Sequence, residues 1–152
     1  MKHGLERIRF DLPPSDWHDH AAERLWAEAL GHDRYRLRNS PFYAYGVSFE
    51  DIVKARRDEV GQLVFETVVI RGGRSTYRLF AQTELDSESS RSSWQKLEAL
   101  GCRYESNGRL ISVDVPATTD IYEVYAQLEQ GVRDRAWDFE EAHCGHEVTQ
   151  RR

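Results

Sequence analysis

The sequence has few cysteines, no long apolar run and no excess of basic residues, and each absence excludes a class of protein. Two cysteines, Cys102 and Cys144, are too few for a disulfide framework and fit free thiols in a reducing compartment. The N-terminal residues are charged where a secretory signal needs apolar ones, and no later run is long enough to cross a bilayer. These absences predict a cytoplasmic protein with no membrane partner.

The charge balance disfavours general binding to nucleic acid. Lys and Arg total 21 against 26 for Asp and Glu, which gives a net charge of -5. Proteins that neutralise many phosphates have the opposite balance. The 152 residues, of which 39% are hydrophobic, are sufficient for a globular core in one domain or two small ones.

The first half of the chain has the period-two alternation of β-strands. Apolar side chains at every second position predict strands over residues 6–12, 23–30 and 34–38. Residues 63–70 form an apolar run rich in β-branched side chains, which favour strands. With a further strand near residues 52–53, about five short strands predict a small β-barrel or curled antiparallel sheet over residues 1–72.

From Ser75 the pattern becomes an alternation of strands and helices. Residues 77–81 predict a strand, and Ser92 with Gln95 predicts a capping box for a helix that ends at Gly101. Asn107-Gly108 is typical of the two-residue type I′ turn of a β-hairpin, here between strands at residues 102–106 and 109–115.

A second helix and a last strand complete this half. Asp120 with Glu123 predicts the helix cap, and residues 137–140 alternate as a strand. The apolar stripe predicted to pack this helix consists of Ile121, Val124, Tyr125, Leu128 and Val132. The order β-α-β-β-α-β is that of ferredoxin-like folds, so we expect an α+β protein in which the β subdomain (1–72) packs against a ferredoxin-like subdomain (73–152) as one compact unit.

A family resemblance rests on four stretches of the sequence, residues 23–28, 34–47, 51–53 and 73–78. They resemble a bacterial family known only as a domain of unknown function (domain of unknown function 4265). The resemblance covers most of the chain and implies a bacterial, cytoplasmic protein of similar length, without an activity or catalytic residues. Small proteins of this kind are sometimes encoded as immunity proteins beside toxins, which is an argument by association alone.

Three metal-ligand types lie close together near the C-terminus, in His143, Cys144 and His146. A structural zinc site needs four ligands, usually in two spaced pairs, and no second pair lies nearby. His18 and His20 would contribute only if the fold brought them to this cluster. Neighbours on a strand point to opposite faces, so His143 and Cys144 do not predict a base and nucleophile. We expect no metal, no cofactor and no catalytic residue.

Two basic segments are candidate binding sites. The glycine pair Gly72-Gly73 lies among cations and hydroxyls that would hold an anion, although the spaced glycines and lysine of a P-loop are missing and a plain turn is the alternative. The possible anion-binding residues are Arg71, Arg74, Ser75, Thr76 and Arg78. Arg34, Arg36 and Arg38 alternate along a predicted strand near Tyr43 and Tyr45, as a platform for single-stranded nucleic acid or a solvated strand face would.

The C-terminal region is acidic, which a solvated helix face explains only in part. An acidic surface attracts basic partners and raises association rates. The predicted partner-binding residues are Glu123, Glu129, Asp134, Asp138, Glu140 and Glu141.

We therefore expect a non-enzymatic protein-binding protein. Its most concrete form is an immunity or antitoxin protein that neutralises a cognate toxin by stoichiometric binding. The alternatives are a regulatory module for a small anion, a nucleotide or RNA, and an enzyme whose site is scattered over the fold.

Overall fold

The computed structural model describes residues 4–85 and 87–148, and its elements fall into two groups along the chain. The first group has five strands: β1 (Leu5–Asp11), β2 (Ala22–Gly31), β3 (Arg34–Leu37), β4 (Ile52–Arg57) and β5 (Leu63–Ile70). The second group is β6 (Ser75–Ala81), α1 (Glu88–Ala99), β7 (Arg103–Asn107), β8 (Leu110–Val115), α2 (Ile121–Arg133) and β9 (Trp137–His143). No helix in these residues is long and apolar enough to span a membrane.

The first five strands form a closed barrel. Strands that follow one another in the chain pair antiparallel, and β1 closes the ring by pairing parallel with β5. Alternate side chains point inward, and Ile8, Leu25, Leu37 and Val53 are almost completely buried there. The prediction of a small barrel or curled sheet in the first half is confirmed.

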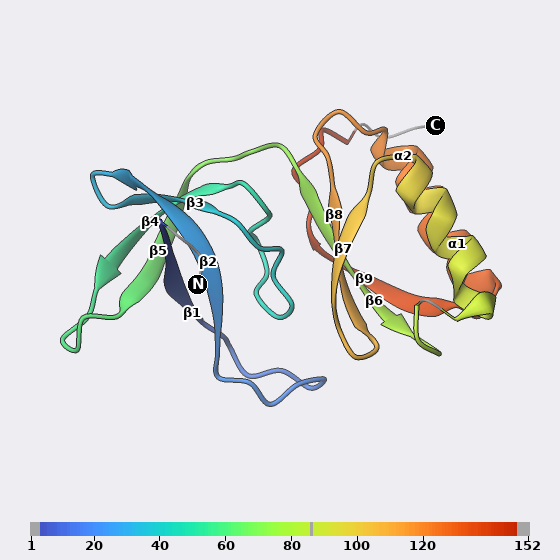
Figure 1. The fold of residues 1–152 in the computed structure, drawn as a ribbon, viewed down its shortest axis with the longest axis horizontal. Coiled ribbons are helices and arrows are strands. Elements are labelled where there is room, and N and C mark those ends of the chain that lie inside the picture. Colours follow the sequence, from blue (N-terminus) through green and yellow to red (C-terminus); the bar gives the residue numbers. More distant parts are fainter. Residues whose placement is uncertain (1–3, 86, 149–152) are drawn as a thin grey trace.

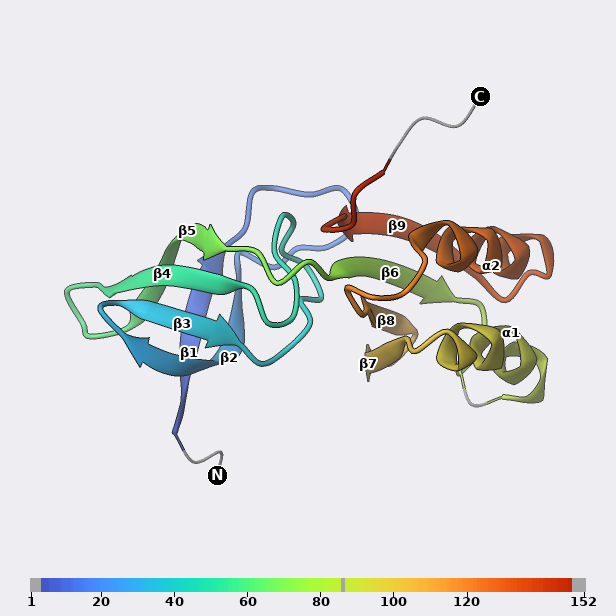
Figure 2. The same cartoon turned by 90° about the horizontal axis from the view of Figure 1, so that it is seen from above.

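The remaining strands form a separate four-stranded sheet in the order β7-β8-β6-β9, with every neighbouring pair antiparallel. Both helices cover one face of this sheet, and the barrel lies on its other side (Figure 1, Figure 2). Leu79 and Ile111 on the sheet pack with Leu97 and Leu128 on the helices in a second apolar core. The predicted order of strands and helices is present.

The first helix begins earlier than predicted. It starts at Glu88 with Ser87 at the N-cap, so Ser92 is an exposed position inside the helix and its predicted capping box is wrong. Ser87 and Ser92 are both residues that N-caps prefer, and only Ser92 also has a Gln three positions later, so the sequence pattern selected the wrong serine. Trp94 and Leu97 are buried as expected.

The hairpin turn is displaced by one residue from the prediction. Asn107 still pairs with Leu110, so the two turn residues are Gly108 and Arg109. Only Gly108 of these has a positive φ, +63°. A type I′ turn needs positive φ at both central positions, so the predicted turn type is also wrong.

The second helix has Asp120 at its N-cap as predicted, but its buried stripe is narrower. The Asp120 carboxylate accepts a hydrogen bond from the Tyr122 N–H at 2.9 Å. Ile121, Val124 and Leu128 are buried. The other two members of the predicted stripe, Tyr125 and Val132, are 44% and 38% exposed.

Candidate functional site at the junction of barrel and sheet

The second sheet buries polar side chains on the face opposite its helices. Thr76 and Arg78 alternate with Tyr77 and Leu79 along β6, and all four are at most 1% exposed. Ser112, which pairs with Arg78 in register, is also fully buried. Buried polar groups require hydrogen-bond partners. Here most of the partners come from the segment between β3 and β4, residues 38–51, which we call the junction segment.

Arg78 binds the backbone of the junction segment. Its guanidinium donates to three carbonyl oxygens at 2.9 to 3.2 Å, those of Pro41, Tyr43 and Ala44. It also forms an ion pair with Glu140 at 3.3 Å. Arginine suits this site because its planar group presents several donors in a fixed geometry.

Hydroxyl groups add further contacts between the same parts. The Ser112 hydroxyl donates to the Pro41 carbonyl at 2.7 Å, and the Ser48 and Thr76 hydroxyls lie 2.6 Å apart. The second sheet therefore holds the junction segment at several points.

Glu23 of β2 holds the junction segment from the barrel side. Its carboxylate, 8% exposed, accepts hydrogen bonds from the backbone N–H groups of Phe42, Tyr43 and Ala44 at 2.6 to 3.0 Å. Successive N–H groups that converge in this way form an anion-binding nest, and the occupant here is the protein's own carboxylate. Glu23 therefore binds the N–H groups of this backbone and Arg78 binds its carbonyl groups, so the segment is held from both sides.

Asp51 ties the end of the junction segment to the chain that enters β6. This fully buried carboxylate accepts from the N–H groups of Ser48 and Gly72 at 2.9 and 2.8 Å, and from Arg71 at 3.3 Å. Arg71 also lies 3.4 Å from Nε2 of His143. Burial, and then the Arg71 charge, lower the pKa of His143.

The five residues predicted to bind an anion all lie at this junction, and each already has a protein partner. Arg74 makes a two-pronged contact with Asp114, Nε to Oδ1 at 2.9 Å and Nη2 to Oδ2 at 2.8 Å, which raises the pKa of Arg74. The Ser75 hydroxyl lies 2.6 Å from Nδ1 of His146. An external anion would have to compete with these groups, and anion binding stays a prediction.

Aromatic rings gather on the surface at one side of the junction. The loop between β1 and β2 brings Trp17 and His18 to within 5.5 and 4.9 Å of the Tyr43 ring, measured between centroids, and His20 stacks on Tyr43 at 4.2 Å. Trp17 also contacts Phe80 of β6 edge to face at 5.2 Å. With Tyr45, whose hydroxyl accepts from Trp17 Nε1 at 3.2 Å, these residues form what we call the aromatic junction cluster: Trp17, His18, His20, Tyr43, Tyr45 and Phe80.

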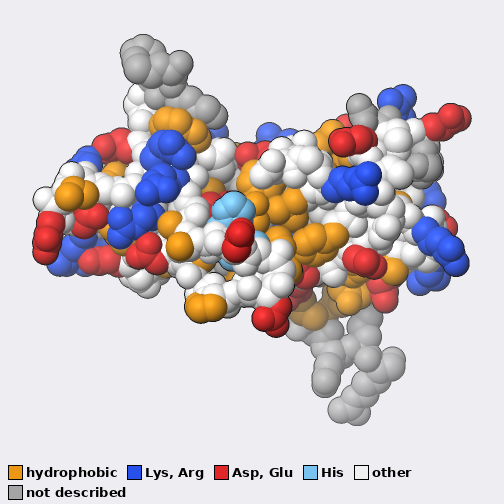
Figure 3. Space-filling model, turned by 90° about the horizontal axis from the view of Figure 1, so that it is seen from below, with side chains coloured by type: hydrophobic (Ala, Val, Ile, Leu, Met, Phe, Trp, Pro, Cys, Tyr) orange, Lys and Arg blue, Asp and Glu red, His pale blue; other side chains and the backbone are white. Residues whose placement is uncertain are grey.

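The aromatic junction cluster is open to a ligand. It borders a hollow of about 310 Å³, and Tyr45 is 49% exposed. The guanidinium carbon of Arg78 lies 4.5 Å from the Tyr45 ring centroid, within the range of a cation–π contact. Hydrophobic side chains gather at the middle of this face of the molecule, with histidine and acidic side chains beside them (Figure 3).

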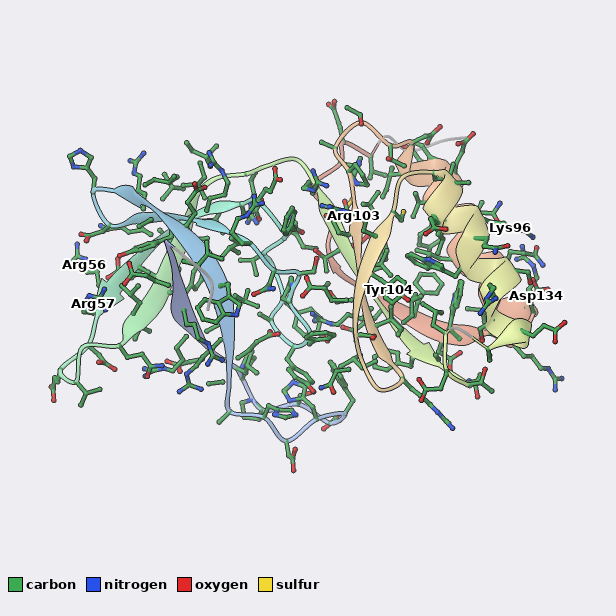
Figure 4. The ribbon with its side chains drawn as sticks, in the orientation of Figure 1. Arg56, Arg57, Lys96, Arg103, Tyr104 and Asp134 are labelled. Carbon is green, nitrogen blue, oxygen red and sulfur yellow. The ribbon has the colours of Figure 1, made fainter. Side chains whose placement is uncertain are left out.

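Phe49 lines a smaller hollow of about 190 Å³ at the same junction. The guanidinium carbons of Arg38, Arg74 and Arg103 lie 5.1 to 5.3 Å from the Phe49 ring centroid. Arg103 and its neighbour Tyr104 project from β7 (Figure 4). Sequence reasoning did not bring these residues together, because they come from three separate segments: the junction segment, the chain before β6, and β7.

Acidic groups balance the charge of these arginines. Arg38 pairs with Glu50 at 3.6 Å, and Arg103 lies 3.7 Å from Asp114. Arg36, also part of the predicted nucleic-acid platform, pairs with Glu28 at 2.9 Å. These pairs favour the solvated strand face over the platform.

The acidic residues predicted to bind a partner divide over two surfaces. Glu123 and Glu129 are exposed on α2, and the Glu141 carboxylate accepts from the Tyr77 hydroxyl on the helix side of the sheet. Asp138 and Glu140 belong to the barrel side, where they pair in register with Phe80 and Arg78. Asp134 caps the end of α2 (Figure 4). Partner binding by these residues stays a prediction.

The histidines near the C-terminus have partners other than a metal. Both ring nitrogens of His146 are engaged, one with Ser75 and the other with the Pro116 carbonyl at 2.8 Å. Across residues 4–85 and 87–148, no group of three His, Cys, Asp or Glu side chains has a geometry suited to a metal ion. His18 and His20 contribute instead to the aromatic junction cluster.

The chain belongs to the family described as Domain of unknown function (DUF4265), whose model matches residues 23–139. Its fold is similar to that in "Novel crystal structure of a hypothetical protein from Neisseria gonorrhoeae", with a TM-score of 0.81 and 16% sequence identity over 97% of this chain and 100% of that one. Identity at this level shows a shared fold alone. No curated protein is significantly similar to the chain.

The matched range divides the aromatic junction cluster. Tyr43, Tyr45 and Phe80 lie inside it, and so does the whole junction segment, whereas Trp17, His18 and His20 precede it. The rings of the loop between β1 and β2 are therefore the part of the cluster outside the family match.

Proposed function

We propose that this chain is a non-enzymatic protein-binding protein that engages its partner through the aromatic junction cluster. The observation that carries the proposal is a partly exposed group of rings that includes Tyr43 and Tyr45, whose backbone segment Glu23 and Arg78 hold from opposite sides. Trp, Tyr and Arg dominate the binding energy of many protein interfaces. A backbone that is already ordered loses less entropy on binding.

Carboxylates beside the cluster favour a basic partner. Asp16 and Asp19 flank Trp17 and His18 in the exposed loop, and Asp138 pairs in register with Phe80. Acidic groups at the rim of an apolar contact act mainly on the rate of encounter with a positively charged partner. Of the predicted acidic residues, Asp138 and Glu140 would contribute here.

Several finer interpretations belong to the same proposal. The sheet order β7-β8-β6-β9 with both helices on one face supports a ferredoxin-like subdomain over residues 73–152, joined to a β subdomain over residues 1–72. An immunity or antitoxin protein in the cytoplasm is one concrete form of the function. The alternative is a module for a small anion, a nucleotide or RNA, and the three arginines around Phe49 favour it.

The test is the affinity of a Trp17→Ala, Tyr45→Ala double variant for a purified partner. The partner is sought as the product of the neighbouring reading frame and as a protein that copurifies from the source organism. Calorimetric titration should give a Kd at least about tenfold weaker for the double variant, because two aromatic anchors are lost. Circular dichroism should remain unchanged.

Val60→Ala is the matched control. It removes an apolar side chain that is 85% exposed at the turn between β4 and β5, away from the cluster, and should leave the affinity unchanged. Equal affinity of the double variant and the wild type would contradict the proposal.

A further inference from the structure

A separate pocket lies on the helix side of the second sheet. It has a volume of about 310 Å³ and is formed by α2, β9, a residue of β6, and Cys144 and Val148 of the segment that follows β9. The side chains that matter for its chemistry are Tyr77, Ile121, Tyr122, Tyr125, Glu129 and Glu141. We call this the tyrosine pocket. The aromatic junction cluster is on the other side of the sheet, so the two sites share no lining residue.

Three tyrosines make the wall of the tyrosine pocket aromatic. Tyr122 and Tyr125 are three residues apart on α2, a spacing that places both side chains on one side of a helix. Tyr77 comes from β6 and is 1% exposed. Aromatic faces attract cations through their negative quadrupole while they also accept apolar groups.

Two carboxylates line the same pocket. Glu129 continues along α2 one turn beyond Tyr125, and Glu141 comes from β9. The Glu141 carboxylate accepts one hydrogen bond from the Tyr77 hydroxyl at 3.2 Å, which leaves it free to accept others. In the part of the chain that the structure describes, no Lys or Arg forms an ion pair with Glu129 or Glu141.

The combination of these groups defines the kind of ligand. An anion would be repelled by both carboxylates, and a neutral apolar molecule would gain no electrostatic attraction from them. A protonated amine would satisfy the carboxylates by charge-assisted hydrogen bonds while its hydrocarbon body lies against the tyrosine rings. The volume is at the lower end of the range for small-molecule sites.

We propose that the tyrosine pocket binds a small organic cation, a protonated amine attached to an aromatic or aliphatic body. This site goes beyond the proposed function, because it needs neither the aromatic junction cluster nor a protein partner.

The test uses three probes of similar shape and different charge. Phenethylammonium carries a positive charge at neutral pH, 3-phenyl-1-propanol is neutral, and 3-phenylpropanoate is negative. Titration followed by amide chemical shifts should show saturable binding of phenethylammonium, with the largest shifts at residues 121–129 and 141. The alcohol should bind at least about tenfold more weakly, and the carboxylate should not bind.

Variants without the two negative charges test whether Glu129 and Glu141 cause the binding of phenethylammonium. A Glu129→Gln, Glu141→Gln double variant keeps the shape of the pocket and should weaken phenethylammonium binding about tenfold or more. Glu123→Gln is the matched control, because Glu123 is an exposed acid on the same helix that does not line the pocket. Its affinity should equal that of the wild type.

Three results would overturn the inference. The first is the absence of a saturable shift at about 10 mM phenethylammonium, a concentration that detects millimolar affinity. The others are equal binding of the amine and the alcohol, and unchanged affinity in the folded Glu129→Gln, Glu141→Gln variant. The Trp17→Ala, Tyr45→Ala variant should bind the probe as the wild type does. Failure of the protein-binding proposal would therefore leave this result intact, and the reverse also holds.

Discussion

The two faces of the second sheet are both buried, yet they are built from different chemistry. On the helix side, Leu79 and Ile111 pack in an apolar core, where contacts are non-directional. On the barrel side, Thr76, Arg78 and Ser112 are fully buried and bind the junction segment through hydrogen bonds, which require defined distances and angles. The comparison indicates that both sides supply stability, and that the barrel side also positions the backbone that carries Tyr43 and Tyr45.

The largest effect is expected from Arg78→Ala on the barrel side. The substitution leaves three backbone carbonyls and the partly buried carboxylate of Glu140, whose side chain is 26% exposed, without their cationic partner. Removal of one member of a buried ion pair typically costs about 3–5 kcal/mol. Urea denaturation should show a loss of this size in the free energy of unfolding.

Arg109→Ala is the control for this prediction, because Arg109 lies exposed in the β7–β8 turn. It should change the free energy of unfolding by less than about 0.5 kcal/mol. If Arg78→Ala lowers the free energy of unfolding as little as Arg109→Ala does, the contacts of Arg78 contribute no more to stability than an exposed surface residue does.

On the helix side, Leu128→Ala should cost about 2–5 kcal/mol. Leu128 is fully buried in α2, so the substitution removes apolar contacts and leaves a cavity. Val132→Ala on the same helix removes a side chain that is 38% exposed and should cost less than about 1 kcal/mol. Equal losses in the two variants would contradict the assignment of the buried stripe.

Gly131→Ala should be destabilising, although the same change in an open helix gains about 1 kcal/mol. An added Cβ would lie within 2.2 to 2.5 Å of three atoms of the Trp137 indole ring. Trp137 is 1% exposed, and its Nε1 donates to the Leu128 carbonyl at 3.0 Å, so the ring has little room to move. Overpacking of this kind costs about 1–3 kcal/mol.

A double-mutant cycle tests the cause of this loss. Combination of Gly131→Ala with Trp137→Phe should cost less than the sum of the two single changes, because the smaller ring makes space for the methyl group. A stabilising Gly131→Ala variant would show that helix propensity outweighs the contact.

Much of the fold depends on local patterns and was therefore predictable. The alternation of apolar and polar residues predicted the strands of the barrel. Asp120 predicted the start of α2, because an N-cap needs only its own side chain and the backbone N–H groups that follow it in the chain. The turn at Gly108 was displaced because turn propensity favours Asn107-Gly108, whereas the pairing of β7 with β8 along its whole length sets the register.

The candidate site was less predictable because its partners are distant in sequence. Arg78 and Ser75 were selected as anion-binding residues for their charge and hydroxyl group, but Arg78 binds carbonyl groups that lie 34 to 37 residues earlier in the chain. A polar residue at every second position of a strand usually indicates a solvated face, and nothing in β6 itself shows that a loop covers it. The same reason hid the contact of Trp17, in the loop between β1 and β2, with Phe80 of β6.

The smallest expected effect is a pH dependence at the edge of the barrel side, where His143 lies beside Arg71. Burial and the Arg71 charge lower the pKa of His143, and the opposing charges of Asp51 and Glu141 only reduce this shift. In the unfolded chain the imidazole returns to its ordinary pKa of about 6.5. Below that value the unfolded state binds a proton at this residue more readily than the folded state does, so acidification favours unfolding.

The comparison of wild type with His143→Gln isolates this contribution, because the remaining histidines and the carboxylates titrate in both proteins. Between about pH 7.5 and pH 5.5, a window that spans the ordinary imidazole pKa, the wild type should lose more unfolding free energy than the variant. Urea midpoints at the two pH values measure the difference, and an NMR titration of the His143 ring in the folded protein should give a midpoint below 6.5. If the variant loses as much unfolding free energy as the wild type between these pH values, burial and the Arg71 charge do not hold His143 in its neutral form. The stability of the polar side of the sheet would then depend on Arg78 and Asp51 and not on the protonation state of His143.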